Sequence, residues 1–125
     1  MTRLSICIPT RNRQRYAMDA ARHMLASKRD DFEVLIADNS DDPAPLAGFV
    51  AEQNDDRLRL LPPEDKPLAM QDNWNRMPDQ ARGEWISIIG DDDYLDPDLC
   101  EVLRLTTQRV PNADAVTWGR SYFVL

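Results

Sequence analysis

The feature that most constrains this sequence is an alternation between short apolar runs and stretches with helical spacing. The apolar runs lie at residues 4–8 (LSICI), 32–37 (FEVLIA), 58–61 (LRLL) and 85–89 (WISII). Near-continuous apolar runs of this kind are typical of strands that are covered on both faces of a parallel sheet. The runs therefore predict a central sheet with helices on both sides.

The stretches between and after these runs place apolar residues at helical spacing. They cover residues 16–27, 45–53, 70–81 and 99–110. Pro78 should kink or divide the third helix, because proline removes a backbone hydrogen bond from a helix interior. The alternation predicts one α/β domain over residues 1–125, with a mostly parallel central sheet, flanking helices and right-handed crossovers.

The C-terminal part of the sequence carries two further signals. Asp96 and Pro97 are typical of an N-cap followed by a proline in the first helical turn, just before the last helix. Residues 115–118 and 122–125 are expected to be extended.

Composition excludes several classes of protein. The chain has 15 Lys+Arg against 22 Asp+Glu, a formal net charge of −7, so it lacks the basic surface of a nucleic-acid binder. It has no apolar run near the roughly 18–20 residues of a membrane span and no signal peptide at Met1, so we expect a cytoplasmic protein. Cys7 and Cys100 lie in apolar patterns and are expected to be buried, reduced thiols.

Polar residues follow three of the expected strands at the point where each strand ends. In an open parallel sheet, ligands bind beyond the carboxyl ends of the strands, so these residues should share one edge of the sheet. The chain has only four glycines and neither a G-x-G-x-x-G nor a P-loop pattern, so a glycine-rich phosphate loop is excluded. The three polar groups are Pro9-Thr10-Arg11-Asn12, Asp38-Asn39-Ser40 and Asp91-Asp92-Asp93.

The aspartate trio is the sharpest of these signals. Adjacent carboxylates repel one another and raise each other's pKa unless a cation or hydrogen-bond donors compensate. Mg²⁺ or Mn²⁺ would compensate, since these ions take oxygen ligands and Mg²⁺ typically binds one or two carboxylates plus substrate phosphates. In extended backbone Asp91 and Asp93 would point to one side and Asp92 to the other, so at most two would serve one ion. The alternative is a solvated acidic turn.

The other two groups also allow a nucleotide. Asp38 ends an apolar strand, where a carboxylate can accept a hydrogen bond from a base or ribose, although an Asx-turn would use it equally well. An acidic protein that binds a diphosphate needs a bridging cation, arginines, or both. Arg11, Arg13 and Arg15 cluster after the first strand, and Arg76 and Arg82 flank the helix divided by Pro78; the alternative for each is a solvated surface charge.

These residues resemble the N-terminal half of the family 2 glycosyltransferases, which have the Rossmann-like GT-A fold. The resemblance rests on three segments in order, LSICIPTRNR at 4–13, FEVLIADNSDD at 32–42 and NWNRMPDQARGEWISIIGDDDYLDPD at 73–98. It covers nearly the whole chain, and Asn75 and Gly83 match an Asn and a Gly that lead into the strand before the family's D-x-D motif.

The resemblance implies a set of site residues. The segment matching residues 9–12 lines the base pocket, Asp38 binds uracil or another base, and the D-x-D motif contacts ribose and holds a divalent ion, Mg²⁺ or Mn²⁺, on the diphosphate. Here Gly90 precedes an unbroken trio, and we favour Asp93 and then Asp92 as metal ligands, with Asp91 toward the ribose. The implied nucleotide-binding residues are Pro9, Thr10, Arg11, Asn12, Asp38, Asn75, Asp91 and Asp92.

The resemblance also implies a reaction: a sugar is transferred from a nucleotide-diphospho-sugar to an acceptor hydroxyl, with inversion at the anomeric carbon. A UDP-sugar is the favoured donor. Such enzymes serve cell-surface polysaccharide synthesis, and the parent enzyme could be membrane-associated. The family's catalytic base and much of its acceptor site come from the later half of the domain. The sequence ends at Leu125, so we expect a donor-binding half that lacks the acceptor-binding half and is inactive alone.

One alternative function remains, a non-catalytic nucleotide-binding or receiver-like regulatory module with a Mg²⁺-binding acidic cluster. A receiver-like module would need an acidic pair after the first strand, where this chain has Thr10-Arg11-Asn12. A sheet with an uncovered edge also favours self-association, so we expect a homo-oligomer.

Overall fold

The computed structural model describes residues 1–119, which form a four-stranded parallel sheet with the order β3-β2-β1-β4. The strands are β1 (Leu4–Thr10), β2 (Phe32–Asp38), β3 (Leu58–Leu60) and β4 (Trp85–Ile88). β1 is central: it pairs with β2 from Leu4↔Phe32 to Thr10↔Asp38, and with β4 from Leu4↔Trp85 to Cys7↔Ile88. The predicted α/β fold with a parallel sheet is confirmed.

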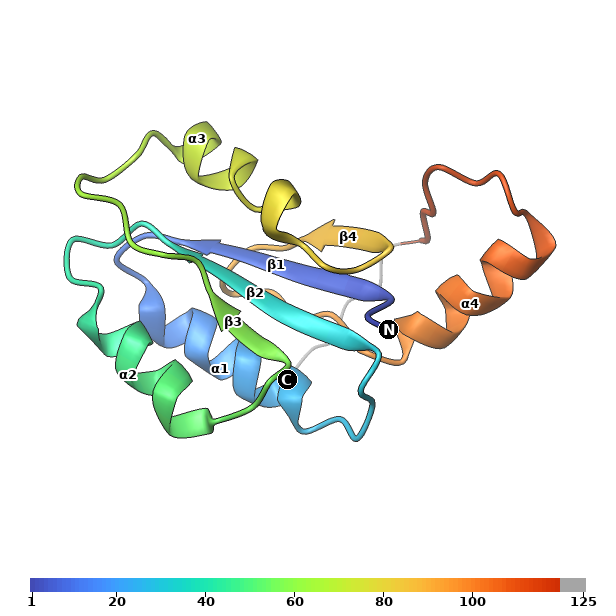
Figure 1. Cartoon of the computed structure of the whole chain (residues 1–125), viewed down its shortest axis with the longest axis horizontal. Helices are drawn as coiled ribbons and strands as arrows, with labels where there is room; N and C mark the ends of the chain where they lie inside the picture. Colours follow the sequence, from blue (N-terminus) through green and yellow to red (C-terminus); the bar gives the residue numbers. More distant parts are fainter. Residues whose placement is uncertain (120–125) are drawn as a thin grey trace.

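The helices cover both faces of this sheet (Figure 1). α1 (Gln14–Leu25) and α2 (Ala44–Gln53) lie on one face, and α3 (Met70–Asn75) and the 3₁₀ helix η1 (Pro78–Gln80) lie on the other. α4 (Leu99–Arg109) extends to one side of the sheet. Among residues 1–119, no helix is both long enough and apolar enough to cross a membrane.

Each helical layer has its own core. The larger core lies between the sheet and α1 and α2, where Ala17, Ala20, Ala21 and Met24 of α1 are buried against one face of the strands. The smaller core lies on the opposite face and consists of Cys7, Leu35, Ala37, Leu61 and Met77.

The first strand is longer than the sequence predicts, because Pro9 lies inside it. Consecutive residues of β1 bond to opposite neighbours: the Cys7 carbonyl accepts from Ile89 beside β4, and the Thr10 carbonyl accepts from Asn39 after β2. Position 9 therefore faces the β4 side, where the pairing ends at Cys7↔Ile88. The missing N–H of Pro9 removes no ladder bond, so the strand continues to Thr10.

Other sequence predictions have mixed outcomes. The helix expected over 70–81 is divided, as Pro78 predicted: α3 ends at Asn75, and Pro78 begins η1. Asp96 was predicted as the N-cap of the last helix, but that helix begins at Leu99 with Asp98 in the N-cap position; Asp96 Oδ1 accepts the N–H of Asp98 at 2.9 Å in the turn before it. Residues 115–118, which were expected to be extended, form no strand, and the segment expected at 122–125 lies outside the described residues.

A buried carboxylate joins three strands on the face that carries α3. Glu33 of β2 is only 3% exposed. Its oxygens accept hydrogen bonds from the Ser5 hydroxyl at 2.6 Å, from the Arg59 guanidinium at 2.8 Å and from the Arg82 N–H at 2.7 Å. Burial by itself raises the pKa of Glu33, but these hydrogen bonds outweigh burial and hold its pKa below the ordinary value of 4.5.

The approach to β4 requires a glycine. The Gly83 N–H donates to the Ser5 hydroxyl at 2.8 Å, and a Cβ at this position would lie 2.5 Å from the Ser5 backbone nitrogen and 2.8 Å from the Leu4 carbonyl carbon. Because these atoms are backbone atoms of the central strand, they cannot move aside cheaply.

Both cysteines are buried and free, as predicted. Burial, reinforced by the nearby Glu33 carboxylate, raises the pKa of the Cys7 thiol to about 12. Burial and Asp31 raise the pKa of Cys100 to about 11. Both thiols therefore stay protonated and unreactive near neutral pH.

We predict that Gly83→Ala lowers the free energy of unfolding by about 1–3 kcal/mol, because the added methyl group overpacks the contact with β1. Gly48→Ala is the matched control. A Cβ at Gly48, within α2, meets no atom within 4 Å, so alanine there should stabilise by about 0.5–1 kcal/mol through helix propensity. Urea denaturation measures both, and equal effects at the two positions would contradict the close approach at Gly83.

We predict that Glu33→Gln lowers the free energy of unfolding by about 2 kcal/mol at pH 7, because a buried charged hydrogen-bond acceptor is lost. Since the folded-state pKa of Glu33 is depressed, its contribution is present above pH 4.5 and is lost as pH falls through the lower folded-state value. Denaturation between pH 7 and pH 3 should therefore show the two proteins converging in acid. A difference that is constant over this range would refute the assignment.

Candidate functional site at the carboxyl edge of the sheet

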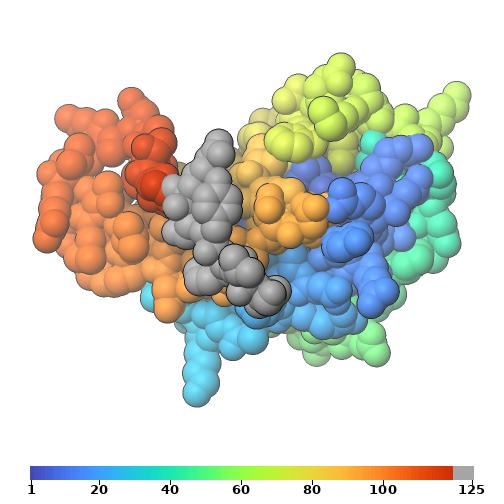
Figure 2. All heavy atoms as spheres, turned by 180° about the vertical axis from the view of Figure 1, so that it is seen from behind, coloured from blue at the N-terminus to red at the C-terminus, as the bar shows by residue number. Residues whose placement is uncertain are grey.

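The chain changes direction across the sheet at the carboxyl end of β1. It leaves β1 toward β2 on one side and returns to β4 on the other side. Such a topological switch point opens a crevice where open α/β sheets bind ligands. The segments after β1 and β4, blue and golden-orange in the space-filling view, lie against each other at this end (Figure 2).

A direct hydrogen bond joins the end of β1 to the segment after β4. The Thr10 hydroxyl donates to Asp91 Oδ2 at 2.9 Å, and Asp91 is only 8% exposed. Arg13, the residue before α1, places its Nη2 atom 3.2 Å from Asp91 Oδ1 and 2.8 Å from Asp92 Oδ2. The hydrogen bond from Arg13 is the main reason that the pKa of Asp92 lies below its ordinary value. The polar group after β1 and the aspartate trio after β4 therefore lie in contact, as the sequence predicted.

The aspartate trio lies in a tight turn. The Asp93 N–H donates to the Gly90 carbonyl at 3.1 Å, and the Gly90 N–H donates to Asp93 Oδ2 at 3.2 Å. The expected alternation of side chains along extended backbone is therefore wrong, because β4 ends at Ile88 and the chain turns at Gly90. Instead Asp92 and Asp93 approach the same space: a Cβ on Gly90 would lie 3.1 Å from Asp92 Oδ1 and 2.9 Å from Asp93 Oδ2.

This geometry matches one mode of divalent-cation binding. Within the part of the chain that the structure describes, no group of three or more His, Cys, Asp or Glu side chains is placed to hold a metal ion. Asp92 Oδ1 and Asp93 Oδ2 nevertheless lie on the same side of Gly90, 3.1 Å and 2.9 Å from the position that a Cβ there would take. Mg²⁺ commonly binds one or two carboxylates and completes its coordination with substrate phosphates and water. The donor set fits a cation that arrives together with a diphosphate.

Asp38, at the end of β2, lines a cavity of about 180 Å³. The other lining residues are apolar: Pro43, Ala44, Ala47, Leu60, Leu61 and Pro63. The Asp38 carboxylate accepts the Gln14 amide at 2.8 Å and the Ser40 N–H at 3.0 Å. The second of these bonds is the Asx-turn that the sequence allowed. The cavity therefore has mostly apolar walls and one acidic lining residue, whose carboxylate is held by Gln14 and the Ser40 N–H.

The loop after β1 is clamped to the loop after β2. Arg11 donates to the Asn39 carbonyl at 2.6 Å and to Asp41 at 3.0 Å. Asn12 takes a left-handed conformation, with φ of 55°, and its side chain exchanges hydrogen bonds with the side chain and the N–H of Asp41. Asparagine tolerates this conformation better than most residues. In this structure, Arg11 and Asn12 therefore position the two loops.

Two polar side chains from the α3 segment bind this edge: Asn73, which sequence reasoning missed, and Arg76, which the sequence had already offered as an arginine for a diphosphate. The buried Asn73 of α3 donates to the Ala37 carbonyl at 3.0 Å, and Arg76 donates to the Asp38 carbonyl at 3.1 Å. Asn75, the predicted site residue in this helix, is exposed on α3. Gln14 was missed as well, although its place at the first position of the helix after β1 could have indicated it. Helical spacing could have separated Asn73 from Asn75, because Asn73 lies four residues before the buried Met77 and so shares its face, whereas Asn75 does not.

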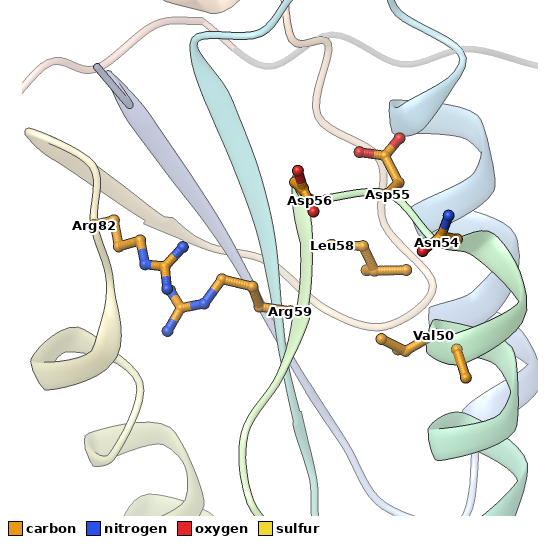
Figure 3. A pocket seen from close by; sticks show the side chains of 8 residues that line it. Val50, Asn54, Asp55, Asp56, Leu58, Arg59 and Arg82 are labelled. Atoms are coloured by element: carbon orange, nitrogen blue, oxygen red, sulfur yellow. The ribbon is translucent and has the colours of Figure 1, made fainter.

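A larger hollow of about 520 Å³ lies away from these residues, at the outer edge of β3 and α2 (Figure 3). Arg59 and Arg82 point toward each other there, and Asp55 and Asp56 stand on the far side. Arg59 is committed to Glu33, and Asp55 to Arg57 at 2.7 Å. The hollow thus has balanced charges, and its lining residues are separate from the residues at the carboxyl edge.

Comparison with known proteins identifies the family. Residues 5–123 match glycosyl transferase family 2. The chain belongs to this family. The match agrees with the residues that suggested the resemblance and favours a glycosyltransferase over a receiver-like module.

Curated relatives from bacteria agree with the family match. The GalNAc(5)-diNAcBac-PP-undecaprenol β-1,3-glucosyltransferase of Campylobacter jejuni is 30% identical over 96 residues, 76% of this chain and 31% of that protein. The glycosyltransferase GlyG of Streptococcus pneumoniae is 29% identical over 122 residues, 95% of this chain and 39% of that protein. The chain thus spans between 31% and 39% of the length of these two relatives.

Solved structures show the same fold. A crystal structure of residues 1–349 of S. aureus TarS superposes with a TM-score of 0.68 at 22% identity and covers 94% of this chain and 39% of that chain. TarS 1–349 in complex with UDP-GlcNAc has a TM-score of 0.70 at 21% identity, over 86% of this chain and 32% of that chain. The parallel sheet with its flanking helices is therefore the GT-A arrangement.

Proposed function

We propose that this chain is the donor-binding part of an inverting glycosyltransferase, and that it binds a nucleotide-diphospho-sugar in the crevice between β1 and β4. The observation that carries the proposal is the junction of Thr10 and Arg13 with Asp91 and Asp92 at the topological switch point. This junction brings the guanidinium of Arg13, the hydroxyl of Thr10 and two carboxylates to the place where open α/β sheets bind ligands.

The cavity beside Asp38 suits a pyrimidine base. Its volume of about 180 Å³ accommodates a single flat ring, and its apolar walls would cover the faces of that ring. Uracil carries one N–H between two carbonyl groups, and the Asp38 carboxylate is an acceptor for that N–H. The relative crystallised with UDP-GlcNAc supports a UDP-sugar as the donor.

The ribose and diphosphate would extend from this cavity toward the β4 segment. Asp91, held by Thr10, is the acceptor that we assign to the ribose hydroxyls. Arg11 and Asn12 would shape the base side through their contacts with the loop after β2. We also assign Pro9, near the end of β1, to this side of the site. Asn75 is the eighth member of the proposed nucleotide site, from the exposed side of α3.

We assign Asp92 and Asp93 as the residues that hold a divalent cation, Mg²⁺ or Mn²⁺, together with the donor diphosphate. The support is the pair of oxygens that bracket the space over Gly90. When bound, such a cation supplies Lewis-acid stabilisation of the departing nucleoside diphosphate. The chain's own residues then orient the donor, with Asp38 on the base, Asp91 on the ribose and Arg13 near the phosphates.

Inversion requires a general base that removes the proton of the acceptor hydroxyl as the oxygen attacks the anomeric carbon. We assign this base to none of residues 1–119. The curated relatives are about three times as long as the matched region, and we propose that the base and the acceptor site belong to such further sequence. The name of the Campylobacter jejuni relative, a GalNAc(5)-diNAcBac-PP-undecaprenol β-1,3-glucosyltransferase, supports a role in glycan synthesis, and we propose cell-surface polysaccharide as the product class.

Two features bear on the setting in which the chain works. Cys7 and Cys100 are free and buried, which supports a reducing compartment such as the cytoplasm. β4 is an edge strand of the described sheet and exposes Ile86 and Ile88, whose exposed fractions are 43% and 36%. An uncovered apolar edge favours strand pairing between copies.

We predict a thermal shift for the proposed donor site. UDP with Mn²⁺ should raise the melting temperature, because a ligand that binds only the folded state stabilises it. At ligand concentrations about 100-fold above Kd, the gain is about 2.7 kcal/mol. The double variant Asp92→Ala, Asp93→Ala should lose the metal-dependent part, while Asp55→Ala, in the hollow beside β3, should keep it. A folded wild-type chain with no shift for any nucleoside diphosphate would exclude the proposal.

We predict that the chain self-associates through β4. Light scattering over a range of concentrations should show a dimer or larger species that an Ile86→Lys, Ile88→Lys variant shifts toward the monomer, because edge lysines disfavour strand pairing. A strictly monomeric wild-type profile at high concentration would contradict this expectation.

A further inference from the structure

Arg13 stands at the mouth of the proposed diphosphate site and already binds its carboxylates. Its Nη2 atom lies 2.8 Å from Asp92 Oδ2 and 3.2 Å from Asp91 Oδ1. The Arg13 and Asp92 side chains are 48% and 54% exposed, so this contact is open to solvent and can break. One guanidinium therefore bridges two of the three adjacent carboxylates.

The bridge solves a problem of charge. Three consecutive carboxylates repel one another unless positive charge compensates. Asp93 turns back to the Gly90 N–H, which leaves Asp91 and Asp92 to Arg13. The hydrogen bond to Asp92 is also the main reason that the pKa of Arg13 is raised. Arg13 thus does for these two side chains what a divalent cation would do.

A second contact holds the Arg13 guanidinium beside the Tyr16 ring. The Arg13 guanidinium carbon lies 4.8 Å from the centre of the Tyr16 ring, and Tyr16 is 53% exposed. A cation–π contact of this kind restrains the side chain without fixing its hydrogen bonds. The planar fork of an arginine also matches the oxygens of a phosphate.

We propose that Arg13 is an exchangeable counter-cation: it neutralises Asp91 and Asp92 in the absence of metal, competes with the divalent cation for Asp92, and turns to the donor diphosphate once that cation binds. This inference rests on the proposed function. Arg13 affects binding of the divalent cation only indirectly, through the Asp91 and Asp92 carboxylates. Toward the cation it is therefore a positioning residue. Its consequence is that donor and cation bind cooperatively, because each takes one partner of an existing ion pair.

The first test measures binding of Mn²⁺ alone to the 125-residue chain at low ionic strength, by the electron paramagnetic resonance signal of free Mn²⁺. Arg13→Gln removes the competitor and should tighten Mn²⁺ binding about three- to fivefold, the size expected for an exposed ion pair. Arg13→Lys keeps the charge and should stay near the wild-type affinity. Lys28→Gln removes the same charge from an exposed position after α1 and should change the affinity little.

The second test titrates UDP by calorimetry at saturating Mn²⁺. Here Arg13→Gln should weaken UDP binding, about tenfold for the loss of one charge-assisted contact to phosphate. Arg13→Lys should weaken UDP binding less, since it retains the charge but not the fork. A role that is only structural would weaken both ligands together, whereas the proposal requires opposite signs for metal and nucleotide. Unliganded melting temperatures confirm that each variant is folded.

The outcomes separate the two proposals. If the wild-type chain binds both ligands but Arg13→Gln leaves Mn²⁺ affinity unchanged or weakens it, the counter-cation role is overturned and the donor site stands. Tighter Mn²⁺ binding with unchanged UDP affinity overturns the turn toward the diphosphate. If the folded wild-type chain binds neither ligand, the proposed function and this inference are both overturned.

Discussion

The pairing of β1 along both of its edges is the constraint on which the rest of the structure depends. It places β2 on one side and β4 on the other, so that the segments after all three strands reach the same edge of the sheet. Two local features permit it. Gly83 lets the chain pass against the β1 backbone, and Pro9 faces the side where the β4 pairing has already ended. Thr10 can therefore reach Asp91 across 81 positions of sequence.

Charge is arranged differently at the two ends of this sheet. Beside the amino-terminal half, Glu33 is buried and fully engaged by Ser5, Arg59 and the Arg82 N–H, so its charge stabilises the fold. At the carboxyl edge, the Arg13–Asp92 pair is half exposed. The chain belongs to glycosyl transferase family 2, and under the proposed function a donor diphosphate and a cation would each replace one partner of this pair.

Much of the fold could be predicted from the sequence, because strands covered on both faces leave apolar runs and helices leave periodic stripes. The division at Pro78 followed from proline's missing N–H. The sequence predictions were wrong where contacts between residues far apart in the sequence determine the local structure. The extension of β1 through Pro9 depends on which neighbour that residue faces, and the tight turn at Gly90–Asp93 depends on where β4 stops. Asn73 is buried and Asn75 exposed because of the way α3 lies on the sheet.

The sequence by itself determined the α/β class, the edge of the sheet that carries the polar residues, and the family to which they belong, because all three follow from local patterns and their order along the chain. Only the tertiary structure decided how those residues are used. In the folded chain, Asp91 contacts Thr10 and Arg13, and Asp93 accepts the Gly90 N–H. Gln14 donates to Asp38, and Arg11 donates to the loop after β2. The physical reason is that a side chain's partners are set by strand register and loop packing, and these join residues that are far apart in the sequence.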